Sequence, residues 1–340
     1  MSKTMKALLF PSPWDVRLIE TPVPEPGPDE VLAEIRSVGI CGSDIGIYEG
    51  NHWIKAHKPG GHGHETGAVA VAVGKNVRGV SPGDHLARMG LGYARYSKEV
   101  NVIGHGKDEQ TAPLPIVRND LTVEEISFAD AVGCALNCYE RAELDRIEGR
   151  RPKAVVLGLG PIGLILTQIL LAKGVDVAVS EPFEKKRLLA ERWGAAAWNP
   201  FGYHRSVYGR KDYTEMILEN FGQADAVFEM AGENNTLLEA VKLVRPGHRV
   251  LVFGAQKIQV IPYEDCRRKG AELVYPEAMM NSKADRDYWE PALDLIAGKG
   301  GYKLDLESLV TKRISLEEAV PLFEHYNREE YIKVIVEPWR

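Results

Sequence analysis

The chain has 340 residues, enough for two domains, and its 44% hydrophobic and 26% charged content is ordinary for a globular protein. Its net charge of −6 argues against general binding to nucleic acids or membrane surfaces, which requires a basic face. No apolar run is long enough to span a membrane, the N-terminus does not resemble a signal peptide, and four cysteines form no disulfide framework. These features predict a cytoplasmic protein.

The first third of the chain is predicted to be β structure. Residues 30–40 (EVLAEIRSVGI) and 66–74 (TGAVAVAVG) alternate with period two, and proline and glycine separate such runs. A helical pattern starts at Thr122, which forms a capping-box pair with Glu125, and continues through DAVGCALNCYERAEL. Pro152 cannot continue that helix and ends the segment.

Strands and helices alternate after this break. Because the strand-like runs are continuously apolar, they predict a parallel sheet covered by helices on both faces. The six runs are AVVLG (154–158), VDVAVS (175–180), AAAW (195–198), DAVFEM (225–230), RVLVFG (249–254) and AELVY (271–275).

The C-terminal tail is predicted to return to the first domain. Ser315 and Glu318 form a second capping box at a helix start, and residues 331–337 (YIKVIVE) are an apolar strand. The expected organisation is therefore a β-rich domain of residues 1–150 and 286–340, with an α/β domain of residues 151–285 inserted into it.

The most specific motif is a glycine pattern. Gly158, Gly160 and Gly163 form G-x-G-x-x-G directly after a strand and at the start of a helix, the context of a dinucleotide site. The first glycine permits a tight turn, the second lets the backbone approach a pyrophosphate, and the third lets helix and strand pack closely. The pyrophosphate would then meet unpaired N–H groups at the positive end of the helix.

Glu181 follows at the end of the next strand. A carboxylate there would accept a hydrogen bond from the ribose 2′-hydroxyl and repel a 2′-phosphate, which favours NAD over NADP. Lys185, Lys186 and Arg187 leave the alternative open, since they could hold a phosphate. Their simpler interpretation is a solvated helix face.

A possible metal site is spread over a long stretch of the sequence. Cys41, His64, Glu65 and Asp130 offer a thiolate, an imidazole and carboxylates, which suit Zn²⁺ at a catalytic site that keeps one position open. Their separation in sequence does not prove it. Taken alone, Cys41 is better explained as a buried thiol, and His64 is equally compatible with a ligand or a core residue.

Four motifs in order along the chain are similar to those of the zinc-containing medium-chain dehydrogenase/reductase family. They are GICGSD (39–44), GHE (63–65), DAVGCALNCYERAEL (130–144) and VLGLGPIGL (156–164). The resemblance covers nearly the whole chain. It implies an α/β fold in which a GroES-like β-rich catalytic domain is combined with a Rossmann domain, a doubly wound parallel sheet of six strands.

The resemblance also implies roles for the metal-site residues. Cys41 and His64 correspond to zinc ligands, Glu65 to a conditional ligand that exchanges with water, and Asp130 to the third ligand position. That position holds a carboxylate in the polyol and sugar branch (sorbitol and threonine dehydrogenase-like), although usually a glutamate. Cys134, one helical turn further on, would substitute if Asp130 turned away, but core packing explains it more simply.

Other residues receive expected roles from the same resemblance. Asp44 corresponds to a buried aspartate behind the zinc, with Lys333 as its expected cationic partner, and Ser43 to the hydroxyl that relays the substrate proton. Catalysis would therefore depend on Cys41, Ser43, Asp44 and His64. The cofactor contacts would include, besides the three glycines and Glu181, the residues Pro161, Ile162, Lys186, Ala231, Phe253 and Gly254.

The chain departs from the family in two places. It lacks the lobe of four closely spaced cysteines that binds a structural zinc, which predicts one zinc per subunit. It also has Gly46 where related enzymes often have a histidine that passes the alcohol proton to solvent, so the proton would leave through water, the cofactor ribose, or Tyr48 or His52.

The predicted reaction is hydride transfer between a secondary alcohol and NAD. Many polar side chains near the expected metal suit a polyol, sugar or cyclitol; they are Tyr48, His52, Trp53, Lys55, His57, His62, Tyr93 and Arg95. The resemblance implies a homodimer or homotetramer. Two alternatives remain at this stage: a zinc-independent quinone or enoyl reductase that uses NADPH, and a NAD-binding protein without enzymatic activity.

Overall fold

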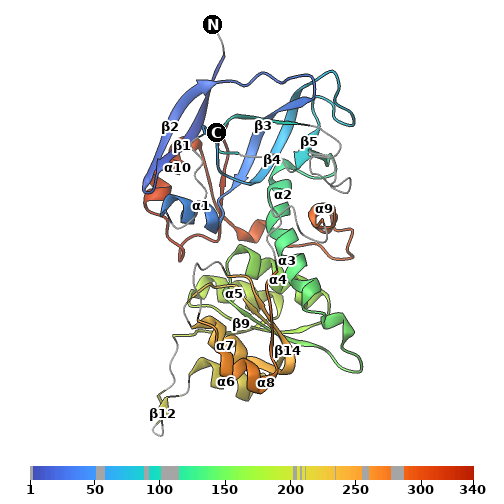
Figure 1. Cartoon of the computed structure of the whole chain (residues 1–340), viewed down its shortest axis with the longest axis vertical. Helices are drawn as coiled ribbons and strands as arrows, with labels where there is room; N and C mark the ends of the chain where they lie inside the picture. The colour runs from blue at the N-terminus through green and yellow to red at the C-terminus, as the bar shows by residue number, and fades with distance from the viewer. Residues whose placement is uncertain are drawn as a thin grey trace. The chain divides into compact units, whose positions relative to one another are not determined.

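The structure, a computed structural model, describes residues 3–50, 58–87, 92–100, 115–201, 205–206, 209–210, 212–233, 235–254, 260–276 and 287–340. Its internal contacts divide the chain into two compact units (Figure 1). The first comprises Met1–Asp130 and Ser282–Arg340, and the second comprises Ala131–Asn281. The first division falls inside a helix, α3 (Ala129–Arg141), whereas the sequence places it after that helix.

The first unit is built on a mixed sheet. Among the described residues its strand order is β16-β17-β3-β4-β5-β7, with β6 paired to β3. The strands are β3 (Glu30–Gly39), β4 (Glu65–Val73), β5 (His85–Ala87), β6 (Tyr96–Val100), β7 (Ile116–Val117), β16 (Val310–Ile314) and β17 (Lys333–Val336). A separate antiparallel pair, β1 (Thr4–Ser12) and β2 (Asp15–Pro22), lies beside it.

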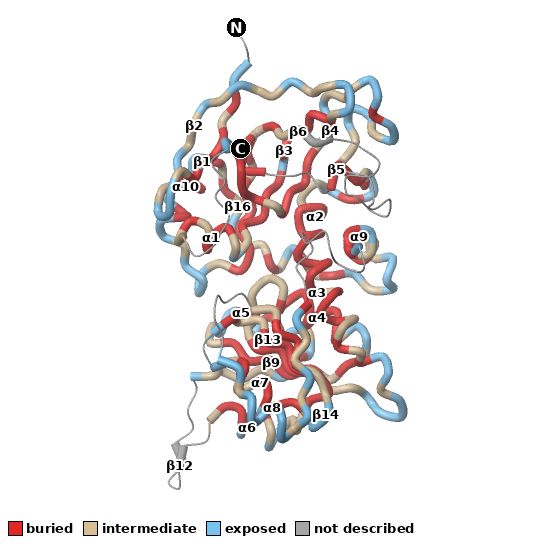
Figure 2. The backbone as a smooth tube through the Cα atoms, in the orientation of Figure 1, coloured by how far each residue is buried: buried red, intermediate tan, exposed pale blue. Residues whose placement is uncertain are grey.

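Several sequence predictions for this unit are confirmed. The two alternating runs form the antiparallel pair β3 and β4, and the tail strand β17 pairs antiparallel with β3. Alternation places one set of side chains in the core, where Ile35, Val38 and Val334 are fully buried. Figure 2 shows these central strands as buried, while the loops around them are exposed.

Short helices surround the sheet: α1 (Gly42–Tyr48), α2 (Val123–Ser127), α9 (Trp289–Ile296) and α10 (Leu316–Glu324). Both predicted capping boxes are present, at Thr122 with Glu125 and at Ser315 with Glu318. The expected continuous helix after Thr122 is wrong, because α2 ends at Phe128 and α3 starts anew at Ala129. Asp130 consequently lies in the first turn of a helix, the position that favours a carboxylate.

The second unit is a six-stranded parallel sheet in the order β10-β9-β8-β13-β14-β15. All six apolar runs predicted as strands are strands, namely β8 (Lys153–Leu157), β9 (Asp176–Ser180), β10 (Ala196–Trp198), β13 (Ala224–Glu229), β14 (Val244–Val252) and β15 (Glu272–Val274). The strand order reverses between β8 and β13. In doubly wound folds, ligands bind at the carboxyl ends of the strands beside such a reversal.

Helices cover both faces of this sheet. In Figure 1, α4 and α5 lie on one face, and α6, α7 and α8 lie on the other. They are α4 (Pro161–Ala172), α5 (Glu184–Trp193), α6 (Tyr213–Asn220), α7 (Thr236–Leu243) and α8 (Tyr263–Lys269). The doubly wound α/β prediction is therefore confirmed.

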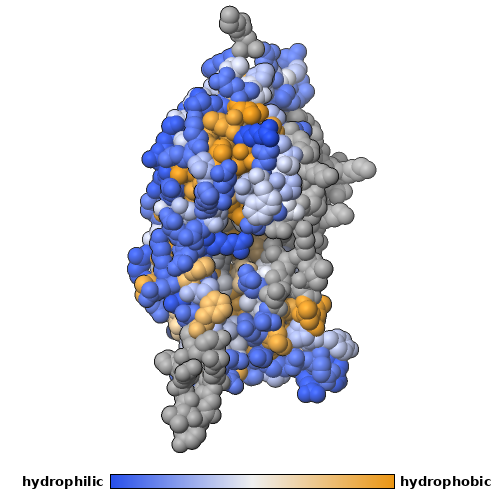
Figure 3. Space-filling view, turned by 90° about the vertical axis from the view of Figure 1, so that its left-hand side faces the viewer, coloured by the Kyte–Doolittle hydropathy of each residue, from blue (hydrophilic) through white to orange (hydrophobic). Residues whose placement is uncertain are grey.

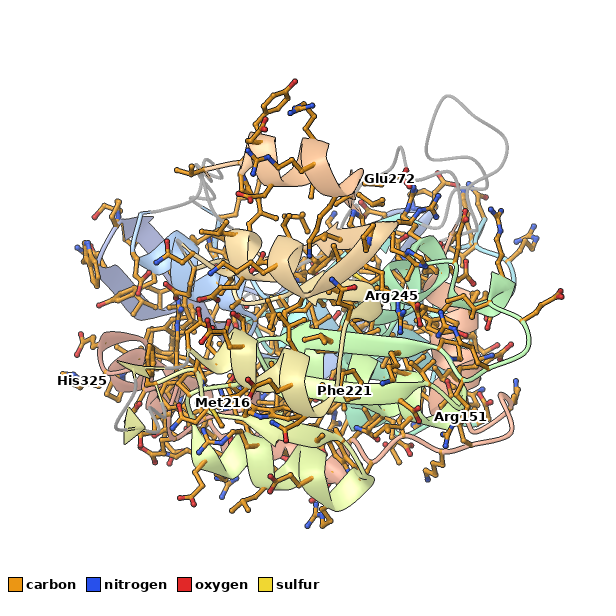
Figure 4. The ribbon with its side chains drawn as sticks, turned by 90° about the horizontal axis from the view of Figure 1, so that it is seen from below. Arg151, Met216, Phe221, Arg245, Glu272 and His325 are labelled. Carbon is orange, nitrogen blue, oxygen red and sulfur yellow. The ribbon has the colours of Figure 1, made fainter. Side chains whose placement is uncertain are left out.

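The outer surface carries two further features. Hydrophilic residues predominate on the face shown in Figure 3, and apolar residues gather in one area of the first unit. A hollow of about 390 Å³ opens at the amino ends of β8, β9 and β10, lined in part by Arg151, Asp176 and Phe221; Arg151 and Phe221 are labelled in Figure 4. That edge is opposite the glycine motif. No described helix is both long and apolar enough to cross a bilayer.

Candidate functional site

The fold brings three distant residues of the first unit together. Cys41 is the N-cap of α1, shortly after β3, while His64 directly precedes β4 and Glu65 begins it. Because Gly39 and Glu65 are register partners across β3 and β4, the ends of the two strands meet. One ligand atom each of Cys41, His64 and Glu65 lies within 4.8 Å of the others.

Asp130 reaches the same cluster from the start of α3. Its Oδ2 lies 3.9 Å from Nε2 of His64, and its Oδ1 is buried without a hydrogen-bond partner. Burial raises the pKa of Asp130 to about 6, against the attraction of His64. A buried carboxylate oxygen without a partner is costly, so this atom is suited to a ligand that supplies positive charge.

The charges around His64 point the same way. Burial alone would lower the pKa of His64, but a hydrogen bond to Cys41 and the negative charges of Cys41, Asp44 and Asp130 raise it well above its ordinary value. The pocket therefore stabilises a cation at this position. A thiol, an imidazole and a carboxylate are the ligand types of catalytic zinc sites, so the residues present fit Zn²⁺.

The partner of Lys333 differs from the sequence expectation. Its Nζ lies 2.5 Å from Oε2 of Glu65 and 3.3 Å from the carbonyl oxygen of Ile40, and both charged side chains are almost fully buried. The predicted pairing of Lys333 with Asp44 is wrong. The sequence could not distinguish two acidic residues that lie near the same strand end.

Asp44 is buried behind Cys41, as predicted, but neutral donors satisfy it. It accepts hydrogen bonds from the N–H of Cys41 at 2.9 Å, the N–H of Gly63 at 3.3 Å and the hydroxyl of Tyr93 at 2.9 Å. Three donors compensate for the loss of water around a buried carboxylate. The involvement of Tyr93 was not predicted, since nothing in its sequence context links it to Asp44.

Two residues near Cys41 bear on proton transfer. Oγ of Ser43 is buried and has no hydrogen-bond partner among the described residues, so it is available to a ligand. Gly46 is buried within α1. No side chain at that position can pass a proton outward.

Three of the predicted substrate donors are buried side chains. Tyr48 is 5% exposed and packs against Trp14, His62 is 4% exposed and meets the ring of Phe10 edge-on, and Tyr93 is fully buried. Their rings belong to the packed interior, and their contact with a substrate stays a prediction. Arg95, another predicted donor, donates to the carbonyl oxygen of Pro338, and its guanidinium lies over the ring of Trp339. The other predicted donors lie outside the described residues; they are His52, Trp53, Lys55 and His57.

The glycine motif of the second unit has the predicted setting, between β8 and α4. Gly158 has φ +96°, and a Cβ there would lie 2.8 Å from the N of Ala231. A Cβ on Gly163 would lie 2.2 Å from the oxygen of Gly158. Gly160 is the N-cap of α4, and a Cβ on it would meet nothing within 4 Å. Open space at the N-terminus of a helix, followed by Pro161 and Ile162 in its first turn, fits a pyrophosphate.

Glu181 stands at the end of β9 and is 4% exposed. Its Oε2 accepts the N–H of Leu159 at 2.7 Å, and its Oε1 accepts that of Phe183 at 3.1 Å. These bonds fix the carboxylate against the glycine motif. A carboxylate has about four acceptor positions, so two remain for a ligand hydroxyl.

The sequence suggested that the basic residues of α5 form a solvated face, but two of the three do not. Lys186 is 6% exposed, and its Nζ lies over the ring of Phe183. Arg187 donates to the carbonyl oxygens of Glu181 and Pro182, both at 2.6 Å. Lys185 is left as the exposed member of the group.

Glu229 is a residue that the sequence analysis missed. It is fully buried at the end of β13, and its Oε1 accepts the N–H of Ala231 and Gly232 and the hydroxyl of Thr236. Its carbonyl oxygen accepts the N–H groups that follow β14, those of Phe253 and Gly254. An acidic residue directly after the apolar run AVF (226–228) was the available signal.

The comparisons with known proteins cover both units. Residues 27–112 match the family model described as alcohol dehydrogenase GroES-like domain, and residues 161–298 match the model described as zinc-binding dehydrogenase. The expectation of a GroES-like domain combined with a Rossmann domain is thereby confirmed.

Similar proteins extend over most of the chain. It is 30% identical over 279 residues to the uncharacterized zinc-type alcohol dehydrogenase-like protein YdjJ of Escherichia coli, covering 74% of this chain and 77% of that protein. It is 28% identical to L-threonine 3-dehydrogenase of Thermococcus kodakarensis, covering 92% of each chain. It is 26% identical to sorbitol dehydrogenase of Ovis aries, covering 97% of this chain and 95% of that one.

The fold is shared with solved structures. The crystal structure of 2R,3R-butanediol dehydrogenase from Bacillus subtilis superimposes with a TM-score of 0.80 at 23% identity, covering 98% of this chain and 99% of that one.

Proposed function

Because the chain belongs to the zinc-type alcohol dehydrogenase family, we propose that it transfers a hydride between a secondary alcohol of a polyol, sugar or cyclitol and NAD. A single catalytic zinc would be held by Cys41, His64 and Asp130. The observation that carries this proposal is the cluster of Cys41, His64 and Glu65. Asp130 approaches it with Oδ2 3.9 Å from Nε2 of His64, and its Oδ1 is buried without a hydrogen-bond partner.

The protein's own residues would orient the substrate and move its proton. Zinc, when bound, would supply Lewis acidity that lowers the pKa of an alcohol, and NAD would supply the hydride acceptor. Ser43 would hydrogen-bond the reacting oxygen through its free Oγ and take up its proton. From there the proton would leave through water or the cofactor ribose, because Gly46 has no side chain to carry it.

Glu65 would stand beside the metal as a reserve ligand. Lys333 holds its Oε2, so metal ligation through that oxygen would require a buried ion pair to break. This favours water or substrate in the fourth zinc position, the arrangement typical of catalytic sites.

The dinucleotide site favours NAD. The carboxylate of Glu181 is fixed beside the glycine motif, where it would bind a ribose hydroxyl and repel a phosphate. Lys186 is buried and the guanidinium of Arg187 is bound to backbone carbonyls, so two of the three cations that could have held a 2′-phosphate are already engaged.

The proposed substrate class is supported by the carboxylate at Asp130 and by the similarity to named dehydrogenases. The similarity to sorbitol dehydrogenase supports a polyol substrate. The similarity to L-threonine 3-dehydrogenase supports a second candidate, oxidation of the hydroxyl of L-threonine. Both substrates have a secondary alcohol beside a second polar group.

Assembly is proposed to be a homodimer or homotetramer. The edge strand β15 leaves one side without a partner strand among the described residues, and large apolar side chains near it in sequence are exposed: Val260, Ile261, Tyr263 and Tyr275. Exposed large apolar side chains beside an edge strand support an association surface here. Light scattering of the purified protein would give a mass of two or four chains; a monomer at micromolar concentration would contradict this proposal.

The function is tested by metal removal combined with a substrate panel. Metal-free protein should not reduce NAD, and zinc should restore NAD reduction with at least one polyol, sugar or cyclitol. L-Threonine, simple alcohols, and quinones or enones with NADPH are the comparison substrates. Preference for L-threonine would select the second candidate, while full activity without metal would indicate a zinc-independent reductase. Dinucleotide binding without turnover of any substrate would indicate a binding protein.

A further inference from the structure

Tyr93 connects the two turns that bear Cys41 and His64. Its side chain is fully buried, and its hydroxyl donates to Oδ2 of Asp44 at 2.9 Å. The same Oδ2 accepts the N–H of Cys41 at 2.9 Å, and Oδ1 accepts the N–H of Gly63 at 3.3 Å. Asp44 therefore joins the start of α1 to the turn before β4, and Tyr93 holds Asp44 from the side.

The backbone of the same segment holds the second turn directly. The N–H groups of Gly92 and Tyr93 both donate to the carbonyl oxygen of His62, at 2.9 and 3.1 Å. The ring of Tyr93 covers Gly63, where a Cβ would lie only 3.0 Å from the ring carbons. Gly63 has φ +83°, a conformation that favours glycine, so the turn that precedes His64 is shaped around this ring.

The core fixes the ring of Tyr93 in turn. Phe323 meets it edge-on with ring centroids 5.8 Å apart, and Phe10 lies at 6.2 Å. Burial and the neighbouring charge of Asp44 raise the pKa of Tyr93 well above its ordinary value, so its hydroxyl keeps its proton and remains a donor at neutral pH.

We propose that Tyr93 is a positioning residue of the metal centre, which sets the separation of Cys41 and His64 through Asp44 and Gly63. This inference rests on the proposed function, in which Cys41 and His64 bind zinc. Removing the hydroxyl would leave the fold in place but free Asp44 to move. Outer hydrogen bonds of this kind typically contribute about 10–100-fold to metal affinity.

The experiment compares Tyr93→Phe with Tyr96→Phe as the matched control. Tyr96 is also nearly buried, but its hydroxyl lies 3.4 Å from Glu34 and does not reach Asp44. Zinc affinity of the metal-free full-length protein is measured by competition with a coloured chelator, together with its thermal unfolding. Tyr93→Phe should weaken zinc binding by about tenfold or more, and Tyr96→Phe by less than about twofold.

A double-mutant cycle with Asp44→Asn separates positioning from general stabilisation. If Tyr93 acts through Asp44, the losses in zinc affinity will not add in the double variant. The absorption spectrum of the cobalt-substituted protein should also change in Tyr93→Phe and not in Tyr96→Phe. Equal zinc affinity in the two tyrosine variants, or additive losses, would overturn the inference even if unfolding changed. Absence of zinc binding by the unmodified protein would instead refute the metal site itself.

Discussion

At the scale of single residues, the site combines a buried carboxylate that has an unpartnered oxygen with an imidazole that lies among negative groups. Asp130 has a buried oxygen with no partner, and its pKa is raised to about 6 by burial. His64 is surrounded by negative groups. Zinc would compensate the charge of the acidic groups, and the imidazole would bind it as a neutral ligand.

Asp130 is therefore predicted to be a resident ligand. Asp130→Asn keeps the size of the side chain but removes its charge, so zinc affinity should fall by more than about tenfold, because a charged ligand contributes at least as much as the groups that orient it. Asp130→Glu keeps the charge and should retain most of the affinity. Zinc content after equilibrium dialysis measures both. Unchanged affinity in Asp130→Asn would assign the third ligand elsewhere.

The pair formed by Lys333 and Glu65 gives a stability prediction. In Lys333→Met, Glu65 is left as a buried charge without a partner, so the metal-free protein should lose about 3–5 kcal/mol in free energy of unfolding. Lys333→Met combined with Glu65→Gln removes both charges and should recover much of that loss. Urea denaturation measures both variants. Equal stability of the single and double variants would show that the pair is not coupled.

At the scale of elements, strand β13 carries a buried acid at each end. Glu229 at its carboxyl end organises the loops that carry Ala231 and Gly254, beside the glycine motif. Asp225 at its amino end is held by Arg150 at 2.6 Å, Arg245 at 3.0 Å and the N–H of Lys153. Figure 4 labels Arg245 among the side chains of the second unit. Both acids are buried, but Glu229 holds loops beside the glycine motif, whereas Asp225 holds groups at the opposite end of the strand.

Glu229→Gln and Asp225→Asn should consequently have different effects. Glu229→Gln disturbs the loops around the dinucleotide site, so NADH affinity, measured by fluorescence titration, should fall several-fold while zinc content is unchanged. Asp225→Asn should lower stability without changing NADH affinity, because its contacts lie at the other edge of the sheet. Equal NADH affinity in both variants would contradict this division.

Asp225 also gives a pH prediction. Burial alone would raise its pKa, but Arg150 and the N–H of Lys153 hold it below its ordinary value. Its contribution is therefore complete above the unfolded pKa of about 3.9 and is lost as the pH falls through the lower folded value. The stability difference between the unmodified protein and Asp225→Asn should be constant near neutral pH and shrink in acid. A difference that grows in acid would contradict the assignment.

The sequence pattern predicted some helices and strands of this fold and missed others. The six parallel strands were predictable because buried strands are continuously apolar, and the capping boxes because their side chains act locally. The break between α2 and α3 at Phe128 could not be predicted, because both helices have the same apolar pattern. Helix α1 was also missed, because GSDIGIY is short and contains two glycines.

At the scale of the whole molecule, the proposed metal ligands lie in one unit and the glycine motif in the other. Spacing could not predict the metal cluster, because Cys41, His64 and Asp130 meet only through strand pairing and the start of α3. The family resemblance supplied them, and the comparisons confirm that family. The resemblance could not supply Tyr93 or the pairing of Lys333 with Glu65, which depend on three-dimensional contacts of this chain.

The separation into units predicts that dinucleotide binding is independent of the metal. Cys41→Ser should bind NADH with the affinity of the unmodified protein, because Cys41 and the glycine motif belong to different units. The same variant should not turn over substrate. Fluorescence titration and a steady-state assay measure the two properties. Loss of NADH binding in Cys41→Ser would show that the units are coupled.

The most direct test of the central claim measures bound zinc and polyol-dependent NAD reduction in the same samples of the unmodified protein and Cys41→Ser. We expect one zinc per chain and measurable activity in the unmodified protein, and loss of both in Cys41→Ser with the fold retained by circular dichroism. A Cys41→Ser protein that retains its zinc, or a metal-free protein that is fully active, would show that Cys41 does not hold a catalytic zinc.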